Sequence, residues 1–471
     1  MKKYDVIIIG AGVLGCFLAR SLRRYRLSVL VLEKADDVCT GISRGGSGII
    51  YAGYDMKPGT RKARMTTDAC IRFPELCRTL GVKYRNPGSL IVSFGENADR
   101  SLRDKLERGM ENGVPGLRLL DRAETLAMEP LLSENVSSAL YAPGTCTVDP
   151  WELGIAAYEN AVSNGARFVF EQAADSIVRR PDGFSVTAAG NEYACRILVN
   201  CAGTAAGDVH ELISEPSVRI RKAAADYIVL EDNVSPAVSH VLFHETEDGS
   251  KGLTLIPTAH GNMMIGQTER ETDAPGDPTD QTGLSRLREL CREVVPGLPA
   301  DKIMRTFAIN RPNPYSVKRS GGEWVPAGKG HFDFSILEED GFFSLIGVKT
   351  PGLTCSNELA EDLTDRILAF LGDVTANPAY DPVRKRPIVV SELSAEERDE
   401  VIKRDPAYGR IVCTCRDISE GEIRDAVKRG ARTLKGIKYR TGAMMGNCQG
   451  SRCMQQLLNE QSILFQAQSG S

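Results

Sequence analysis

The first 34 residues combine two short apolar runs with a glycine-spaced turn between them. Residues 4–9, YDVIII, form a short β-branched run that is typical of a strand buried on both faces. The glycine-spaced stretch GAGVLG follows at once and leads into helical spacing, and a second apolar run, SVLVLEK at 28–34, contains Glu33 near its end. This strand, turn, helix and second strand predict a Rossmann-like βαβ unit at the start of the chain.

Each special residue of this unit has a physical task. Gly10 permits the tight turn, Gly12 lets the backbone approach a pyrophosphate, and Gly15 allows the helix to pack closely on the strand. The free amides at the helix start then face the anion, and Glu33 is placed to accept hydrogen bonds from a ribose. We therefore expect a dinucleotide, although this fingerprint serves FAD and NAD alike.

Two later segments continue the α/β pattern. Residues 197–208, ILVNCAGTAAGD, are a buried strand that runs into a small-residue turn, and Phe342–Leu371 reads as a strand, a turn rich in Gly and Pro, and a long amphipathic helix. Amides at the start of that helix, from Gly352, Leu353 and Thr354, would stabilise negative charge on a reduced flavin. A strand-to-helix connection with a glycine turn and no bound ligand explains the same pattern equally well.

Bulk composition excludes several classes of protein. The chain of 471 residues is long enough for two to four domains, and its 42% hydrophobic and 25% charged residues are ordinary for a globular protein. The net charge of -4 shows no polybasic face, so we expect no nucleic-acid partner. Asp5 interrupts what would be the apolar core of a signal peptide, and we see no transmembrane segment. We expect a cytoplasmic protein, or one held peripherally at the membrane by a partner.

Only the last four of the thirteen cysteines cluster. Cys413 and Cys415 stand one residue apart, Cys448 follows after thirty-two residues, and Cys453 after four more. In a reducing compartment such a cluster indicates metal binding, and the spacing alone fits zinc and iron–sulfur equally. The segment SEGEIRDAVKRG, which lies between Cys415 and Cys448, has a capping box and an apolar face. A unit of roughly 50 residues buries little apolar surface, so a metal site would compensate.

Four motifs follow one another along the chain: TGISRGGSGIIYAGYDMKPGTRKARM at 40–65, IPTAHGNMMIGQT at 256–268, FAINRP at 307–312 and GVKTPGLT at 347–354. Together they resemble the D-amino-acid-oxidase superfamily of FAD enzymes, in particular the branch with L-2-hydroxyglutarate dehydrogenases and anaerobic-type glycerol-3-phosphate dehydrogenases. The stretch IVCTCRDISEGEIRDAV, with GNCQGSRC further on, resembles a bacterioferritin-associated-ferredoxin-like module that binds a [2Fe-2S] cluster.

The resemblance implies an α/β protein with a Rossmann-like FAD-binding domain, an antiparallel-sheet α+β substrate domain of the D-amino-acid-oxidase type, and a small C-terminal helical iron–sulfur domain. The expected division is 1–85, 146–218 and 330–371 for the FAD domain, 86–145 and 219–329 for the substrate domain, 372–408 for a linker and 409–462 for the [2Fe-2S] domain.

The resemblance also implies the site residues. FAD would be bound by Gly10, Gly12, Gly15, Glu33, Lys34, Ser43, Arg44, Ser47, Gly203, Gly352, Leu353 and Thr354. The cluster would be held by Cys413, Cys415, Cys448 and Cys453. Arg311, which we place before Pro312 at the end of an apolar strand, would clamp an anionic substrate group, because a guanidinium offers a bidentate fork to carboxylate or phosphate.

The chain departs from its relatives at the expected catalytic positions. Tyr51 stands where relatives carry a histidine, Lys349-Thr350 replaces a Glu-Ser pair, and Gln267 replaces a proline. The catalytic base therefore stays open among His260, Lys349 and Tyr51. For His260 the alternative is a structural histidine bonded within its turn, and for Lys349 a solvated lysine.

These features predict an FAD-dependent dehydrogenase of a small anionic hydroxy compound, either glycerol 3-phosphate or a 2-hydroxy acid such as L-2-hydroxyglutarate. Substrate hydride would go to flavin, and electrons would leave through the cluster to a partner subunit or carrier. Two alternatives stay open: an electron-transfer subunit of a multi-subunit flavoprotein complex, and an amine or imino-acid dehydrogenase.

Overall fold

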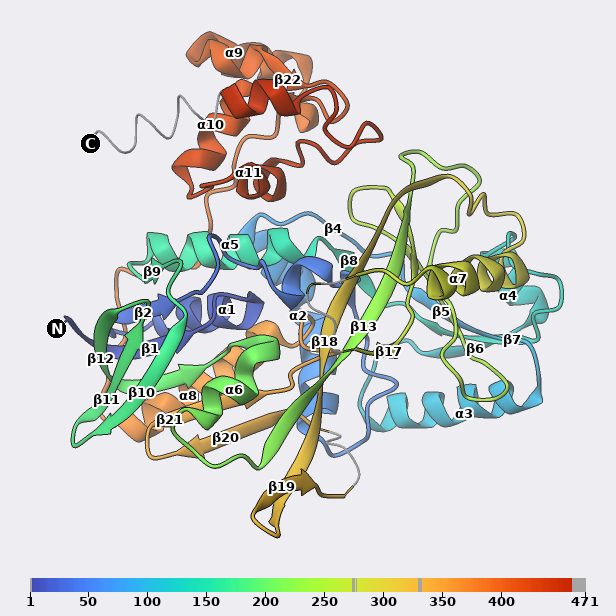
Figure 1. Ribbon diagram of the computed structural model, residues 1–471. Coiled ribbons are helices and arrows are strands. Elements are labelled where there is room, and N and C mark those ends of the chain that lie inside the picture. Colours follow the sequence, from blue (N-terminus) through green and yellow to red (C-terminus); the bar gives the residue numbers. More distant parts are fainter. Residues whose placement is uncertain (1, 273–275, 277, 329–332, 460–471) are drawn as a thin grey trace.

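Two layered units stand side by side, with a small helical module above them (Figure 1). The computed structural model describes residues 2–272, 276, 278–328 and 333–459. The expected boundary at 329/330, residue 1 and the last residues of the expected cluster domain, 460–462, lie outside the described residues. Within the described ranges, no helix combines the length and the apolar character needed to cross a bilayer.

The first unit is built on an eight-stranded sheet whose centre is parallel. The parallel strands, in spatial order, are β21 (Phe342–Ile346), β12 (Asn191–Asn200), β1 (Lys2–Ile9), β2 (Val29–Leu32) and β9 (Arg167–Val169). The antiparallel strands β10 (Ala174–Arg180), β11 (Gly183–Ala188) and β20 (Ser335–Glu339) complete it.

The second half of strand β1, residues 6–9, is buried on both faces, as its apolar run predicts. Val6 and Ile8 point into one core and Ile7 and Ile9 into the other. The first of these cores is formed with α1 (Val13–Leu22), α5 (Pro150–Ser163) and α8 (Ser356–Leu371). The short helix α6 (Ala206–Glu211) follows β12 on the other side. The carboxyl ends of β1 and β2 therefore open between the layers, where a nucleotide binds in folds of this kind.

The second unit is a ten-stranded sheet, antiparallel except where β14 pairs with β5. In spatial order the strands are β19 (Glu323–Pro326), β18 (Ile303–Ser320), β13 (Val218–Leu230), β16 (Met263–Gly266), β15 (Thr254–Pro257), β14 (Val241–His244), β5 (Ser89–Ser93), β7 (Ser138–Ala142) and β6 (Arg118–Asp121), with β17 (Arg270–Glu271) against β13. The helices of this unit are α3 (Glu96–Glu111), α4 (Arg122–Met128) and α7 (Gln281–Val294).

Strand β18 runs further than the sequence pattern predicts. Arg311 was expected where an apolar strand ends, but it lies inside β18, opposite Ala223 of β13. Pro312 and Pro314 are also strand residues, although proline cannot donate to a ladder. Over this stretch β18 pairs only with β13, so its other side is an edge without a pairing strand, where proline is tolerated.

Short elements join the two units. The helix α2 (Arg61–Leu80) follows the 3₁₀ turn η1 (Ile42–Gly45), and a small sheet is formed by β3 (Ile49–Ile50), β8 (Cys146–Val148) and β4 (Tyr84–Arg85). The 3₁₀ turn η2 (Gly203–Ala205) follows β12.

The C-terminal module has a core of its own. Its elements are η3 (Val390–Glu392), α9 (Ala395–Arg404), η4 (Pro406–Gly409), β22 (Ile411–Cys413), β23 (Ile418–Ser419), α10 (Glu420–Lys428) and α11 (Leu434–Thr441). Helix α10 begins with the capping box that the sequence predicts, since Ser419 and Glu422 satisfy each other's backbone amides. Ile423, Ala426 and Val427 are buried in the same core as Cys413.

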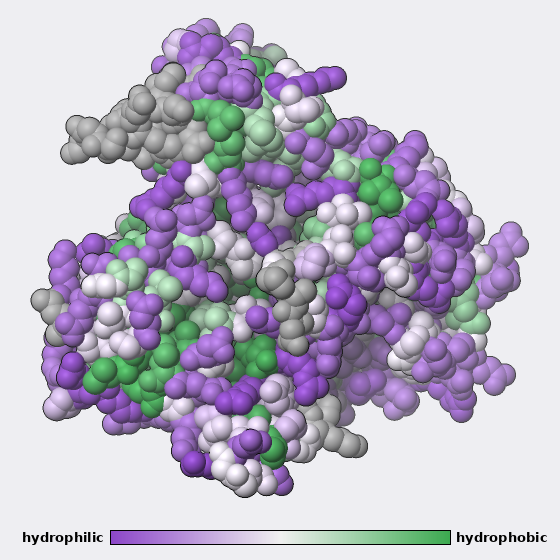
Figure 2. All heavy atoms as spheres, viewed as in Figure 1, coloured by the Kyte–Doolittle hydropathy of each residue, from purple (hydrophilic) through white to green (hydrophobic). Residues whose placement is uncertain are grey.

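Most of the face seen in Figure 2 is hydrophilic, with hydrophobic residues gathered at the lower left, where Figure 1 draws α6 and β21. The module rises above this body at the top of the view.

Candidate functional site

A cavity of about 490 Å³ lies between the two sheets. It runs from Glu33 at the end of β2 to Arg311 on β18. Ten of the twelve predicted cofactor residues line it: Gly10, Gly12, Glu33, Lys34, Ser43, Ser47, Gly203, Gly352, Leu353 and Thr354. Of the predicted catalytic residues, Tyr51, Lys349 and Arg311 line it as well, and His260 does not.

The turn between β1 and α1 fits a pyrophosphate. Gly10 has φ +102°, and a Cβ there would lie 2.6 Å from the carbonyl oxygen of Cys201. A Cβ on Gly15 would lie 2.0 Å from the Gly10 carbonyl oxygen, so the predicted close packing of helix on strand is present. Gly12 caps α1 without a side-chain hydrogen bond, which leaves amides at the helix start for a ligand.

The ribose end of the cavity is defined by Glu33. Its buried carboxylate accepts hydrogen bonds from the backbone amides of Ala11, at 2.6 Å, and Ala35, at 2.9 Å. These bonds fix the carboxylate beside the glycine turn. On the other side of the turn, the Ser43 hydroxyl accepts a hydrogen bond of 3.0 Å from the Val13 amide. The residues present therefore fit the ADP half of FAD.

The middle of the cavity is shaped by close contacts between η1 and β18. A Cβ on Gly45 would lie 2.6 Å from the Cβ of Ile309, so only glycine lets this loop lie against the strand. Across the cavity, Gly352, Leu353 and Thr354 form the turn before α8. The Thr354 hydroxyl accepts a hydrogen bond of 3.1 Å from the Tyr51 amide. The predicted helix N-terminus thus borders the cavity where a ring could lie.

Arg311 places an unsatisfied cation at the far end of the cavity. Its side chain is buried, and Nη2 donates to the Thr350 hydroxyl at 2.7 Å. Within the described part of the chain, Nη1 has no hydrogen-bond partner. A buried guanidinium with a free donor is costly unless an anion completes it. The geometry therefore favours an anionic ligand next to Arg311.

The charge of Arg311 acts on neighbouring groups. Burial lowers the pKa of Lys349, Glu269 opposes this shift, and the charge of Arg311 adds to it. The Lys349 Nζ donates to the Asn313 amide oxygen. Desolvation and the charges of Arg311 and Lys349 lower the pKa of Lys251. Burial would raise the pKa of Glu269, but Arg311 and a hydrogen bond from Asn313 lower it. This end of the cavity is a cationic site beside one carboxylate.

Two tyrosines face the same space. Burial raises the pKa of Tyr51, and Arg311 only partly offsets this effect. Burial also raises the pKa of Tyr227, whose hydroxyl hydrogen-bonds to the Gln267 side chain. Both tyrosines therefore keep their protons near neutral pH and act as hydrogen-bond donors rather than bases.

His260 lies outside the cavity lining. Its Nε2 is 3.2 Å from Asp149 Oδ2 and 3.7 Å from Glu152 Oε2, at the start of α5. Burial would lower the pKa of His260, but its hydrogen bonds with Asp149 and Glu152 raise it to about 9. This position favours a structural role for His260, although its partners lie at the start of α5 and not within its own turn as the sequence suggested.

Arg44 does not line the cavity either. Its charge and a side-chain hydrogen bond act on Tyr439 of α11, where they oppose the rise in pKa that burial causes. The predicted FAD-binding loop therefore faces the cavity with Ser43 and Ser47 and faces the C-terminal module with Arg44.

The four clustered cysteines come together in two pairs. The sulfur atoms of Cys415 and Cys448 are 3.3 Å apart. Burial, together with the neighbouring Cys413, raises the pKa of Cys453 to about 11. The Cys415 thiol and the amides of Gly450 and Arg452 lower the pKa of Cys448 to about 7. Four thiols on two loops, with amides directed at one of them, fit a [2Fe-2S] cluster.

The sequence did not point to Tyr227, Ile309 or Asn313 as site residues. Tyr227 lies on β13, while Ile309, Arg311 and Asn313 occupy every second position of β18. Every second residue of a strand lies on the same face of the sheet, but only the pairing register shows which face borders the cavity.

Two family models match the chain. The model described as FAD dependent oxidoreductase matches residues 5–366, and the model described as BFD-like [2Fe-2S] binding domain matches residues 411–459. The chain belongs to the FAD-dependent oxidoreductase family and carries a C-terminal [2Fe-2S] domain. The predicted fold class, enzyme class and both cofactors are thereby confirmed.

The chain is also similar to individual proteins over most of its length. The glycerol 3-phosphate dehydrogenase of Caloramator mitchellensis is 34% identical over 457 residues, which are 96% of this chain and 92% of that protein. The anaerobic glycerol-3-phosphate dehydrogenase subunit A1 of Haloferax volcanii is 25% identical over 98% of this chain and 83% of its own. The dithionite-reduced L-alpha-glycerophosphate oxidase of Mycoplasma pneumoniae, with FAD bound, superposes with a TM-score of 0.75 at 23% identity, over 83% of this chain and all of that one.

Proposed function

We propose that this enzyme oxidises the secondary hydroxyl group of glycerol 3-phosphate. The observation that carries the proposal is the buried Arg311, whose Nη1 has no partner among the described residues and which lies at the end of the cofactor cavity. Similarity along nearly the whole chain to a glycerol 3-phosphate dehydrogenase supports a phosphate as the anion.

Arg311 anchors the phosphate in this proposal. A guanidinium presents parallel N–H donors that match two phosphate oxygens, and Nη2 is already oriented by Thr350. A dianionic phosphate interacts more strongly with the Arg311 guanidinium than a single carboxylate does, because the attraction grows with the charge of the anion.

Lys349 accepts the hydroxyl proton of the substrate. A general base needs a pKa near the working pH, and burial together with Arg311 moves the pKa of Lys349 down toward that range. Tyr51 and Tyr227 have pKa values shifted the other way, so they orient the substrate as hydrogen-bond donors. His260 takes no part in this scheme, because it does not line the cavity.

When bound, FAD supplies a two-electron acceptor and the [2Fe-2S] cluster a one-electron outlet. The chain's own contribution is to place the substrate at one end of the cavity, to hold the ADP half with the glycine turn and Glu33, and to keep η1 close against β18 through Gly45. We propose that a partner subunit or carrier accepts the electrons, since the Haloferax volcanii relative is named as a subunit.

A 2-hydroxy acid is the second candidate, because Arg311 binds carboxylate by the same fork. The test is the rate of flavin bleaching in anaerobic protein with a panel of glycerol 3-phosphate, L-2-hydroxyglutarate, glycerol, glycine and proline. We expect rapid bleaching by glycerol 3-phosphate alone. If the hydroxy acid or an amino acid bleaches the flavin instead, that compound is the substrate and the proposal is wrong. If no compound bleaches the flavin while a partner protein does, the chain is an electron-transfer subunit.

A further inference from the structure

Helix α11 is in contact with both the cysteine core and the FAD unit. On its inner side Ile437 is fully buried in the module core, together with Cys413 and Cys453. On its outer side Tyr439 packs against the core of the FAD unit. After α11 ends at Thr441, the chain continues through Ala443 and Met444, which belong to the same buried core as the two cysteines.

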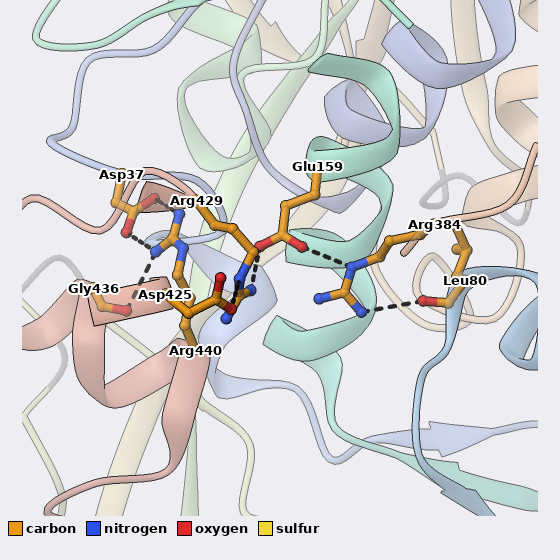
Figure 3. A network of polar contacts seen from close by, with 8 residues as sticks. All are labelled: Asp37, Leu80, Glu159, Arg384, Asp425, Arg429, Gly436 and Arg440. Atoms are coloured by element: carbon orange, nitrogen blue, oxygen red, sulfur yellow. Dashed lines mark hydrogen bonds and ion pairs between the residues drawn. The ribbon is translucent and has the colours of Figure 1, made fainter. Parts of the chain in front are cut away.

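Buried ion pairs hold α11 and its neighbour α10 against the FAD unit (Figure 3). Arg440 donates to Asp37 at 2.8 Å, and the Arg440 side chain has no exposed surface. Arg429, which directly follows α10, donates to Glu159 of α5 at 2.6 Å, and Arg384 donates to the same carboxylate at 2.7 Å. Breaking a buried pair leaves an uncompensated charge, so these contacts fix the module in one position.

An aromatic pair lies in this fixed interface. The rings of Trp151 and Tyr439 have centroids 5.3 Å apart, with their planes tilted by 40°. Trp151 is the second residue of α5, and the residue before it, Pro150, lines the cofactor cavity. A continuous series of contacts therefore joins the cavity wall to Tyr439 and, through α11, to the cysteine core.

We propose that Trp151 and Tyr439 form the route by which electrons cross from the cofactor cavity to the cysteine cluster. Electron tunnelling weakens steeply with every gap between packed atoms, and this ring pair is an aromatic contact across the interface between the two units. A fixed interface suits such a route, because the spacing between donor and acceptor stays constant from one turnover to the next.

The balance of the step is simple. The alcohol carbon of the substrate loses a hydride and its hydroxyl loses a proton, so that a carbonyl forms and two electrons enter the protein. Each crossing would carry one electron from the reduced flavin to the cluster. A one-electron acceptor, ferricyanide in the test tube, would reoxidise the cluster before the second electron follows.

The inference rests on the two cofactors and not on the identity of the substrate. We therefore test it with light, by photoreducing the bound flavin of anaerobic holoprotein in the presence of EDTA and following the cluster by freeze-quench electron paramagnetic resonance. The variants are Trp151→Leu and Tyr439→Leu, with Trp151→Phe and Tyr439→Phe as conservative replacements. Trp324→Leu, on β19, is the matched control, since it is the only other tryptophan.

Both leucine variants should slow cluster reduction by about tenfold or more, with flavin bleaching, iron and labile sulfide unchanged. The phenylalanine variants and the control should stay near wild type, which separates the route from a merely structural contact. Tyr439→Leu could disturb the module and lose its cluster. In that case the rate in Trp151→Leu alone tests the proposal, because Trp151 lies outside the module. Cluster reduction at the wild-type rate in Trp151→Leu, or equal slowing in the phenylalanine variants, would overturn the proposal. Failure of the substrate panel would leave this result unaffected.

Discussion

Arg440 and Asp37 form a buried ion pair that joins the C-terminal module to the loop after β2. Both oxygens of Asp37 accept hydrogen bonds from the guanidinium, and the two side chains are 0% and 7% exposed. Asp37 lies four residues after Glu33, the predicted ribose ligand, so the module is fastened close to the cofactor cavity.

We expect Asp37→Asn to loosen the module. Removing one charge of a buried pair costs about 3–5 kcal/mol, because the other charge stays buried without its partner. Hydrogen exchange should then show faster exchange of α11 amides while β1 stays protected. Glu400→Gln, which removes an exposed pair with Lys403, is the control and should change stability by about 0–1 kcal/mol. Unchanged protection of α11 would show that the pair does not fasten the module.

Gly45→Ala should weaken FAD binding. The new Cβ would lie 2.6 Å from Ile309, so either η1 or β18 must move, at a cost of about 1–3 kcal/mol. Gly207→Ala is the control, because Gly207 lies in the helix α6 outside the cavity lining and its new Cβ would come no closer than 4.0 Å to a neighbouring heavy atom. Flavin retained after gel filtration measures the difference. Equal retention by the two variants would contradict the close fit of η1 to the strand.

Arg311→Ala should reduce kcat/KM for the anionic substrate by on the order of 100-fold, mainly through KM. Losing a charged hydrogen-bonded anchor costs about 2–5 kcal/mol, and each 1.4 kcal/mol is tenfold. Arg311→Lys should recover part of the loss, because lysine keeps the positive charge but lacks the two parallel N–H donors of the guanidinium. Steady-state kinetics with a one-electron dye measures both variants. An unchanged KM in Arg311→Ala would remove this residue from the substrate site.

Lys349 should determine the pH dependence of kcat. A base works in its neutral form, so the rate should rise with pH until Lys349 is deprotonated, at a pH below the ordinary range of lysine because burial and Arg311 lower its pKa. Lys349→Met should lower kcat by about 10²–10⁴-fold and abolish this rise. Lys318→Met, at an exposed position of β18, should keep the wild-type profile. A full pH-dependent rise in Lys349→Met would assign the base elsewhere.

His260 should contribute to stability rather than to catalysis. Its pKa is raised to about 9 in the folded protein, so its contribution is complete below the ordinary pKa of 6.5 and disappears as pH rises through 9. His260→Gln should lower the melting temperature near pH 7, by a change of about 0.2–1 kcal/mol, and the difference should vanish at about pH 10. A large loss of kcat at unchanged stability would instead support a catalytic His260.

Local sequence signals predicted local structure well. The glycine turn with Glu33 and the capping box of Ser419 are short-range patterns whose physical causes act within a few residues, and the structure has both. The clustered cysteines were found in the same way, because their spacing sets them apart from the isolated ones.

Long-range packing explains what the sequence could not predict. Arg44 belongs to a predicted FAD loop, yet its side chain faces Tyr439, and no local pattern reports a contact across nearly four hundred residues. Tyr227 reaches the cavity only through the register of β13 with β18. The domain boundaries stay a proposal, supported by the strands of the second sheet, which come from 89–142 and 218–326.

The most direct measurement is an anaerobic titration of the purified holoprotein with glycerol 3-phosphate, followed by optical absorption and electron paramagnetic resonance. We expect the flavin band to bleach and the signal of a reduced [2Fe-2S] cluster to appear in the same sample, with iron and labile sulfide each near two per chain, as this type of cluster requires. Bleaching of the flavin while the cluster stays oxidised, even after long equilibration, would contradict the account. So would zinc in place of iron at the four cysteines.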